Sequence, residues 1–342
     1  MKTSTISSLS VSNAIQLVVS HAQKEAVKLE NESVTGTYYD VGLELGVKTS
    51  QSLNFNRESA RLQSIVDSNA LAAQRMETSQ LAMGQMAASA QSILDTFVGV
   101  TGASDGTSST VAANTALAEL ENFAGVALTS VNGEFVFSGI NTDAQTLPTG
   151  FIDDIKQDFS DALDTYLAAN GLGSVSDMTG DDVDAFIADY TAAFDWSSWT
   201  NASDTVMSSR ISMTETVKTS ASLNGDGFKN LVLSAIIGSQ LTRENMQSDA
   251  LAQVKYNVVE ISGAAVSGIN AAQSQLGLSQ SRIENANETL ATQKTIIDTQ
   301  LSNLVSVDQY EANVRLTALM TQLETSYTIT AKIQQLSLVN FL

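Results

Sequence analysis

Residues 55–97 read FNRESARLQSIVDSNALAAQRMETSQLAMGQMAASAQSILDTF and contain no proline. Apolar side chains recur every seven residues along this stretch, and a second apolar set follows three positions after the first. Such a heptad seam predicts one long helix that packs against a partner helix, with its methionines in the core. The first set is Phe55, Leu62, Met76, Met83, Ala90 and Phe97, with Asn69 as its polar exception, and the second is Ile65, Ala72, Met86 and Ile93.

A second periodic stretch, in the last quarter of the chain, supplies a candidate partner helix. Its apolar side chains also lie one heptad apart, and helical spacing continues from there toward the C-terminus. Another helix is predicted to begin near Phe228 and to end before or near the glycines at 263–268. The heptad positions are Ile283, Leu290, Ile297 and Leu304.

The N-terminal segment is predicted to be helical from about Ile6 to Leu29, because one face is apolar and both Gly and Pro are absent. Gly36 is expected to end this helix, since glycine readily adopts the positive φ found at helix C-termini. Residues 37–49 contain two further glycines and no clear period, which favours an extended connector.

The residues after Lys332 are apolar on more than one face of a helix. Such a helix is not stable in water by itself, so the N-terminal helix, neighbouring subunits or both must cover it. Exposed apolar ends favour head-to-tail contacts that build a helical assembly. The predicted assembly interface consists of Val11, Ile15, Val18, Leu29, Leu316, Leu323, Ile333, Leu336, Leu338 and Phe341.

The middle of the chain, residues 146–222, is more acidic and more aromatic than the rest and holds both tryptophans, Trp196 and Trp199. Two short amphipathic helices with aspartates in their first turns are predicted here, where the carboxylates oppose the helix dipole. Weak strands are predicted for 205–222. This segment is interpreted as a small insert of mixed α/β character whose tryptophans form its core.

The predicted fold is therefore mainly α: an elongated helical bundle or coiled coil of N- and C-terminal helices, with a short β-hairpin and the small insert. Three domains are expected. Residues 1–34 with 305–342 form an inner terminal coiled coil, 35–145 with 223–304 form a helical rod, and 146–222 form the outer insert.

Composition excludes several classes of function. The chain has 37 acidic and 17 basic side chains and a formal net charge of −20, which disfavours binding to nucleic acid or anionic membranes. There is no cysteine, the single histidine is His21, and no phosphate-binding glycine loop is present. The sequence therefore predicts no enzyme, no cofactor and no metal site. It also shows neither a conventional secretory signal nor a membrane span.

Three stretches resemble the flagellin superfamily. Residues 128–139, LTSVNGEFVFSG, are similar to the family's helix–turn–strand segment that ends in Phe-Ser-Gly. Thr35-Gly36 followed by a glycine-containing connector is the second. The third is the tail at 326–342, SYTITAKIQQLSLVNFL, which resembles members that join the flagellar hook to the filament. The tail together with the N-terminal Met1-Lys2-Thr3-Ser4 most resembles their alphaproteobacterial, rhizobia-like form. The resemblance does not cover residues 146–222.

This resemblance implies a structural subunit of the bacterial flagellum that is exported unfolded through the flagellar type III apparatus and acts outside the cell. It implies self-assembly into a ring, with another hook-associated protein on the hook side, flagellin on the filament side, and an export chaperone. Two alternatives remain open at this point. One is a filament-forming flagellin, and the other is a secreted binding module that uses Trp196 and Trp199 in the 146–222 insert.

Overall fold

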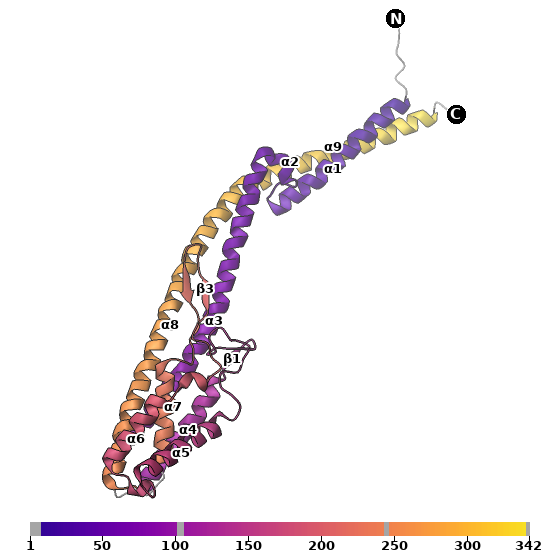
Figure 1. Ribbon diagram of the computed structural model, residues 1–342. Coiled ribbons are helices and arrows are strands. Elements are labelled where there is room, and N and C mark those ends of the chain that lie inside the picture. Colours follow the sequence, from indigo (N-terminus) through magenta and orange to yellow (C-terminus); the bar gives the residue numbers. More distant parts are fainter. Residues whose placement is uncertain (1–7, 101–105, 243–245, 340–342) are drawn as a thin grey trace. The chain divides into compact units, whose positions relative to one another are not determined.

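A computed structural model describes residues 8–100, 106–242 and 246–339 (Figure 1). The fold is mainly α with two small antiparallel hairpins, which confirms the predicted fold class. The longer helices are α1 (Ser8–Thr35), α3 (Thr49–Gly99), α4 (Gly106–Ala127), α5 (Phe151–Asn170), α6 (Gly180–Ala193), α7 (Asp226–Leu241), α8 (Ser248–Val305) and α9 (Gln309–Val339). The short elements are α2 (Val41–Leu45), β1 (Ser130–Val131), β2 (Glu134–Phe135), β3 (Ser208–Arg210), β4 (Thr216–Lys218) and 3-10 turns at Gly46–Lys48, Val175–Asp177 and Trp196–Ser198.

The chain forms two compact units. Unit 1 comprises Met1–Ser64 and Ala291–Leu342, and unit 2 comprises Ile65–Leu290. The helices α3 and α8 contribute residues to both. The three-domain division expected from the sequence stays a prediction.

The heptad seam lies on α3, as predicted. Its positions from Met76 to Phe97 are buried in the core of unit 2. The polar exception, Asn69, is also buried, and its side-chain amide has specific partners. Nδ2 donates to the Ile211 carbonyl at 3.0 Å and to Asn287 Oδ1, on α8, at 2.7 Å. A polar heptad position thus links α3, α8 and the loop beside β3.

The expectation for the connector at 37–49 is wrong in part. The connector at 37–49 is not extended throughout, because it contains α2 and a 3-10 turn, and the side chain of Asp40 caps α2 by accepting from the Leu43 amide at 2.9 Å. The helix predicted to begin near Phe228 is α7, which ends at Leu241, before the glycines at 263–268 as expected. The next helix, α8, then runs continuously through those glycines from Ser248 to Val305.

The glycine at position 268 serves helix packing rather than helix ending. A Cβ atom on Gly268 would lie 2.7 Å from the Cα atom of Gly227, and one on Gly227 would lie 2.5 Å from the Ile269 nitrogen. Only two glycines allow the start of α7 to approach α8 this closely.

Residues 146–222 share one core with the surrounding helices of unit 2. Phe151, Phe159 and Phe186 belong to the same buried cluster as residues of α4, α7 and α8. Trp196 is buried, its ring lies 6.4 Å from that of Phe123 on α4, and its Nε1 donates to the Leu223 carbonyl at 2.8 Å. Trp196 is thus a core residue, as expected, whereas Trp199 is partly buried against the same core.

Both hairpins are held against α3. In β1–β2, Asn132 and Gly133 have φ values of 54° and 86°, as a two-residue turn of the mirror-image type requires. Arg75 on α3 donates from Nη2 to the Phe135 carbonyl at 2.7 Å and pairs with Glu134. The β3–β4 hairpin is held by Asn69 of α3, which donates to the carbonyl of Ile211 in the loop between the two strands. In this hairpin Ser209 lies opposite Val217, and both strands fall within 205–222, where weak strands are predicted.

Candidate assembly interface

Unit 1 is built around the pairing of α1 with α9. The two helices lie side by side and run in opposite directions (Figure 1). Their contacts follow the antiparallel register, because the side chain of Gln309 packs beside Gly36 at one end and Gln23 Nε2 donates to the Tyr327 hydroxyl at 2.7 Å farther along. The two terminal stripes recognised in the sequence thus face each other.

The buried seam between α1 and α9 is thin. Among the described side chains of these two helices, the buried apolar ones are Ala22, Leu29, Ala312 and Leu323. Two of the four are alanines, which cover little area. Because burial of apolar area is the main source of folding free energy, this pair has far less stabilisation of its own than the core of unit 2.

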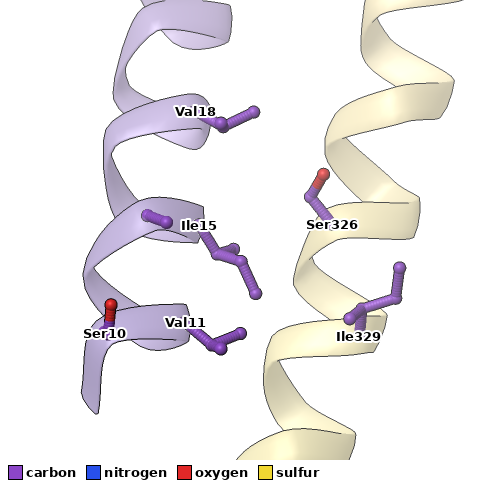
Figure 2. Close-up of a pocket in the computed structure, with 7 residues that line it drawn as sticks. Ser10, Val11, Ile15, Val18, Ser326 and Ile329 are labelled. Atoms are coloured by element: carbon purple, nitrogen blue, oxygen red, sulfur yellow. The ribbon is translucent and has the colours of Figure 1, made fainter. Parts of the chain in front are cut away.

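A groove opens between the two helices toward their outer ends, with a cavity volume of about 340 Å³. Figure 2 shows Val11, Ile15 and Val18 of α1 projecting toward α9, whose Ser326 and Ile329 also line the groove. The lining is almost entirely apolar and includes no charged side chain. An intramolecular seam that is closed near Leu29 is therefore incomplete near Val11.

Apolar side chains remain exposed on both helices of the pair. Leu17 is 73% exposed and Val27 is 51% exposed on α1, while Val314 is 53% exposed and Ile329 is 47% exposed on α9. Most of the large exposed apolar side chains in the described residues belong to unit 1, although unit 2 is larger. Many exposed apolar side chains on one pair of helices are typical of a surface that contacts another protein.

The inner end of the pair is fixed by backbone hydrogen bonds. The Tyr38 amide donates to the Val305 carbonyl at 3.0 Å, and the Val307 amide donates to the Gly36 carbonyl at 2.9 Å. These bonds flank an isolated bridge between Thr37 and Ser306. The breaks between α1 and α2 and between α8 and α9 are thus joined to each other, a feature that we call the backbone clasp (residues 36–38 with 305–307).

Charged groups reinforce this end. Lys28 Nζ donates to Glu44 Oε1 at 2.7 Å, and this hydrogen bond is the main cause that raises the pKa of Lys28. The buried carboxylate of Glu32 accepts from the Tyr39 amide at 3.1 Å. The turn after α1 is therefore held by both side chains and backbone, whereas the outer end of the pair is held by few apolar contacts.

The predicted interface residues fall into four groups. Leu29 and Leu323 are buried in the seam, Leu316 is partly buried, and Val11, Ile15 and Val18 line the groove. The side chains of the other four lie outside the described residues: Ile333, Leu336 and Leu338 belong to the last turns of α9, and Phe341 follows it.

Sequence reasoning missed Leu17, Val27 and Val314, because these residues lie off the main apolar stripe. A signal was nevertheless present, since both terminal helices carry aliphatic residues on several faces at exposed positions.

The described ranges contain no clustered set of metal-ligating side chains. No group of three or more His, Asp or Glu side chains within 8–100, 106–242 and 246–339 is arranged to hold a metal ion. In the same ranges, no helix has the length and apolar character needed to cross a membrane.

Comparison with known proteins gives two family matches. Residues 6–142 match the bacterial flagellin N-terminal helical region, and residues 259–342 match the bacterial flagellin C-terminal helical region. No curated protein sequence matches the chain significantly. A solved structure from Vibrio parahaemolyticus, provisionally assigned as a flagellar hook-associated protein, is similar in fold, with a TM-score of 0.54 and 12% identity over 75% of this chain and 97% of that one.

Proposed function

The chain belongs to the flagellin superfamily, the structural proteins of the bacterial flagellum, and we propose that it joins the hook to the filament. In this proposal, subunits assemble into a ring outside the cell. The ring contacts another hook-associated protein on the hook side and flagellin on the filament side. Export proceeds through the flagellar type III apparatus with the help of a chaperone.

The observation that carries the proposal is that the α1–α9 pair exposes many apolar side chains and buries few between its two helices. Leu17 and Val27 on α1 and Val314 and Ile329 on α9 are about half exposed or more. A monomer gains little by ordering these helices, because their apolar side chains stay in water. Packing of several pairs against one another buries the same side chains.

The interface residues proposed for this packing are those predicted from the sequence. Val11, Ile15 and Val18 line an open apolar groove into which a neighbouring subunit's side chain fits. Leu29, Leu316 and Leu323 hold the pair together, and the C-terminal set completes the contact surface: Ile333, Leu336, Leu338 and Phe341.

The tail at 326–342 supports a junction subunit over a filament subunit, because it resembles junction members most closely. The fold shared with the structure from Vibrio parahaemolyticus is compatible with either role. A filament-forming flagellin is the second candidate, favoured by the same two family matches.

Deletion of the gene distinguishes the two roles. A strain that lacks a junction subunit is expected to show hooks without filaments in electron micrographs, with flagellin released into the medium. Normal filaments on the deletion strain would contradict the proposal. Growth of long filaments from the purified protein on filament seeds would instead establish a flagellin.

A charge variant tests the interface itself. Leu336→Asp with Leu338→Asp is expected to abolish assembly and motility, because a carboxylate cannot be buried unpaired among apolar side chains. The matched control, Ser160→Asp with Ala168→Asp, adds the same two charges at exposed positions of α5 in unit 2. Motility of the tail variant equal to that of the control would refute packing of the tail in the assembly.

A further inference from the structure

A second surface of unit 2 has the features of a binding site. Helices α5 and α6 enclose an open groove with a volume of about 700 Å³. Its lining from α5 extends from Asp158 to Asn170, which is about three helical turns. Side chains of α6 from Ala185 to Ala193 line the other side. The assembly surface of unit 1 contributes nothing to this groove.

The floor of the groove is aromatic and well supported. The ring of Tyr166 is partly exposed, and the buried ring of Phe186 lies behind it at 5.4 Å. Tyr190 stacks on Phe186 at 6.1 Å, and its hydroxyl donates to Asp158 Oδ2 at 3.0 Å. An aromatic face beside a carboxylate attracts cationic groups. The packing behind Tyr166 fixes this face before any ligand arrives.

The charge around the groove has one sign. Asp158, Asp161 and Asp189 line it, and no basic side chain does. Residues 151–195 contain eleven aspartates and a single basic residue, Lys156, so this short segment holds half of the net charge of −20. A cleft lined by charges of one sign attracts ligands of the opposite sign.

Internal ion pairs do not neutralise this charge. Within the described part of the chain, no salt bridge involves an aspartate of α5 or α6. Burial, followed by the carboxylates of Asp182 and Asp189, raises the pKa of Tyr166.

We propose that this groove binds a basic amphipathic helix of another protein, with its Lys or Arg side chains paired to Asp158, Asp161 and Asp189. A helix suits the groove because the walls carry small residues such as Ala169 and Ala185, which let a second backbone approach. A metal ion fits poorly, because the described carboxylates do not converge in a group of three. A small free cation would occupy only part of a groove that is three turns long.

The test measures binding of a basic helix to the full chain. The probe is a fluorescein-labelled amphipathic peptide of about 15 residues composed of Ala, Leu and Lys, and its counterpart carries Glu in place of Lys. Fluorescence anisotropy at low salt is expected to show binding of the Lys peptide and none of the Glu peptide. Added salt should weaken binding, since mobile ions screen exposed charges.

Variants locate the binding site. Asp161→Asn with Asp189→Asn removes two charges from the groove with little change of shape and should weaken binding about tenfold. Asp164→Asn with Asp181→Asn removes the same charge from exposed positions of α5 and α6 outside the groove lining and should change the affinity less than about twofold. Ala169→Trp, at an exposed wall position, should block the groove while circular dichroism shows the wild-type helix content.

Three outcomes would overturn the proposal. Failure of the wild-type chain to bind the Lys peptide at low salt would exclude a basic partner. Equal weakening in both charge variants would show that net charge, rather than the groove, attracts the peptide. Displacement of the peptide by an equal concentration of spermidine would identify a small polyamine as the better occupant.

Discussion

Arg75 is an unusual residue in this molecule, because it is a buried cation on a heptad helix. Its guanidinium binds the Phe135 carbonyl and pairs with Glu134, and its Nε has no hydrogen-bond partner among the described atoms. The carboxylate of Glu134 is about half exposed. The contribution of Arg75 therefore rests mainly on its hydrogen bond to the hairpin backbone rather than on a fully buried ion pair.

Replacement of Arg75 by Met is expected to lower the free energy of unfolding by about 1.5–3 kcal/mol, the usual range for hydrogen bonds to a charged group. The methionine keeps the aliphatic volume, so the loss reports the polar contacts. Urea unfolding followed by circular dichroism measures it. The control is Glu134→Gln, which should lower the free energy of unfolding by less than about 1 kcal/mol, because the carboxylate of Glu134 is about half exposed to solvent. Equal costs for the two variants would contradict this assignment.

Tyr190 makes the stability of unit 2 sensitive to alkaline pH. Burial first, and then the carboxylate of Asp158, raises the pKa of Tyr190 above the usual value near 10. The folded state therefore keeps this phenol neutral where the unfolded state ionises. The stabilising effect is complete below pH 10 and is lost as the pH rises above it.

Tyr190→Phe should therefore make the fall in unfolding free energy between pH 9 and pH 11 shallower than in the wild-type chain. Urea titrations at the two pH values measure this slope. Tyr256→Phe is the control, because Tyr256 is 62% exposed and should leave the slope unchanged. A slope for Tyr190→Phe as steep as that of the wild type would show that another group is responsible.

At the scale of elements, the close approach of α7 to α8 depends on a pair of glycines. A Cβ on Gly268 would meet the backbone of Gly227 at 2.7 Å, and backbone cannot rotate away as a side chain can. Gly125 on α4 provides the opposite case, since nothing lies within 4 Å of a Cβ placed there. Gly268 is therefore required for close helix packing, whereas the space around Gly125 would accept a larger side chain.

Gly268→Ala is expected to destabilise the protein by about 1–3 kcal/mol, as overpacking does. Gly125→Ala should stabilise it by about 0.5–1 kcal/mol, because alanine loses less backbone entropy in a helix. Thermal and urea unfolding measure both. The explanation fails if the two substitutions shift stability in the same direction.

The same elements show how far the sequence predicts the fold. The periodicity of α3 and of the terminal helices is sufficient to identify them, because heptad spacing follows directly from helix geometry. The continuity of α8 through Gly263 and Gly268 could not be predicted, since a glycine that permits close packing has the same sequence signal as one that ends a helix. The hydrogen bonds of Asn69 could not be predicted either, because its partners Ile211 and Asn287 are distant in sequence.

The candidate site was predictable to a similar degree. The apolar stripe with Val11, Ile15 and Leu29 was visible, because spacing alone places these side chains on one face. The exposed Leu17 and Val27 were not, since whether an aliphatic residue off the stripe is covered depends on the partner helix. The acidic groove between α5 and α6 also required the structure, because only packing shows that Tyr166 forms a floor between the aspartates.

At the scale of the whole molecule, burial is distributed unevenly. The large hydrophobic cluster lies within Ile65–Leu290. In unit 1, the buried apolar side chains among the described residues are few: Ala22, Leu29, Leu62, Ala312 and Leu323. The two units are therefore expected to differ strongly in their free energies of unfolding.

A fragment that spans residues 65–290 should fold by itself and unfold in one cooperative urea transition, because it contains the complete core. A fragment of residues 146–222 should not fold alone, since Trp196 packs on Phe123 and hydrogen bonds to Leu223 outside that range. Circular dichroism and the dispersion of amide NMR signals measure both. Cooperative unfolding of the short fragment would establish 146–222 as an autonomous domain.

The backbone clasp constrains how the two ends of this chain can change in length. It fixes Gly36 opposite Val307, and from this shared origin α1 and α9 extend over 28 and 31 residues. An insertion of one heptad into α1 alone would make that helix longer than α9 and leave about one turn of it, four residues, without an opposite partner. Deletions and insertions in the terminal helices are therefore tolerable only as matched pairs, so that two segments about 270 positions apart in the sequence must vary as one.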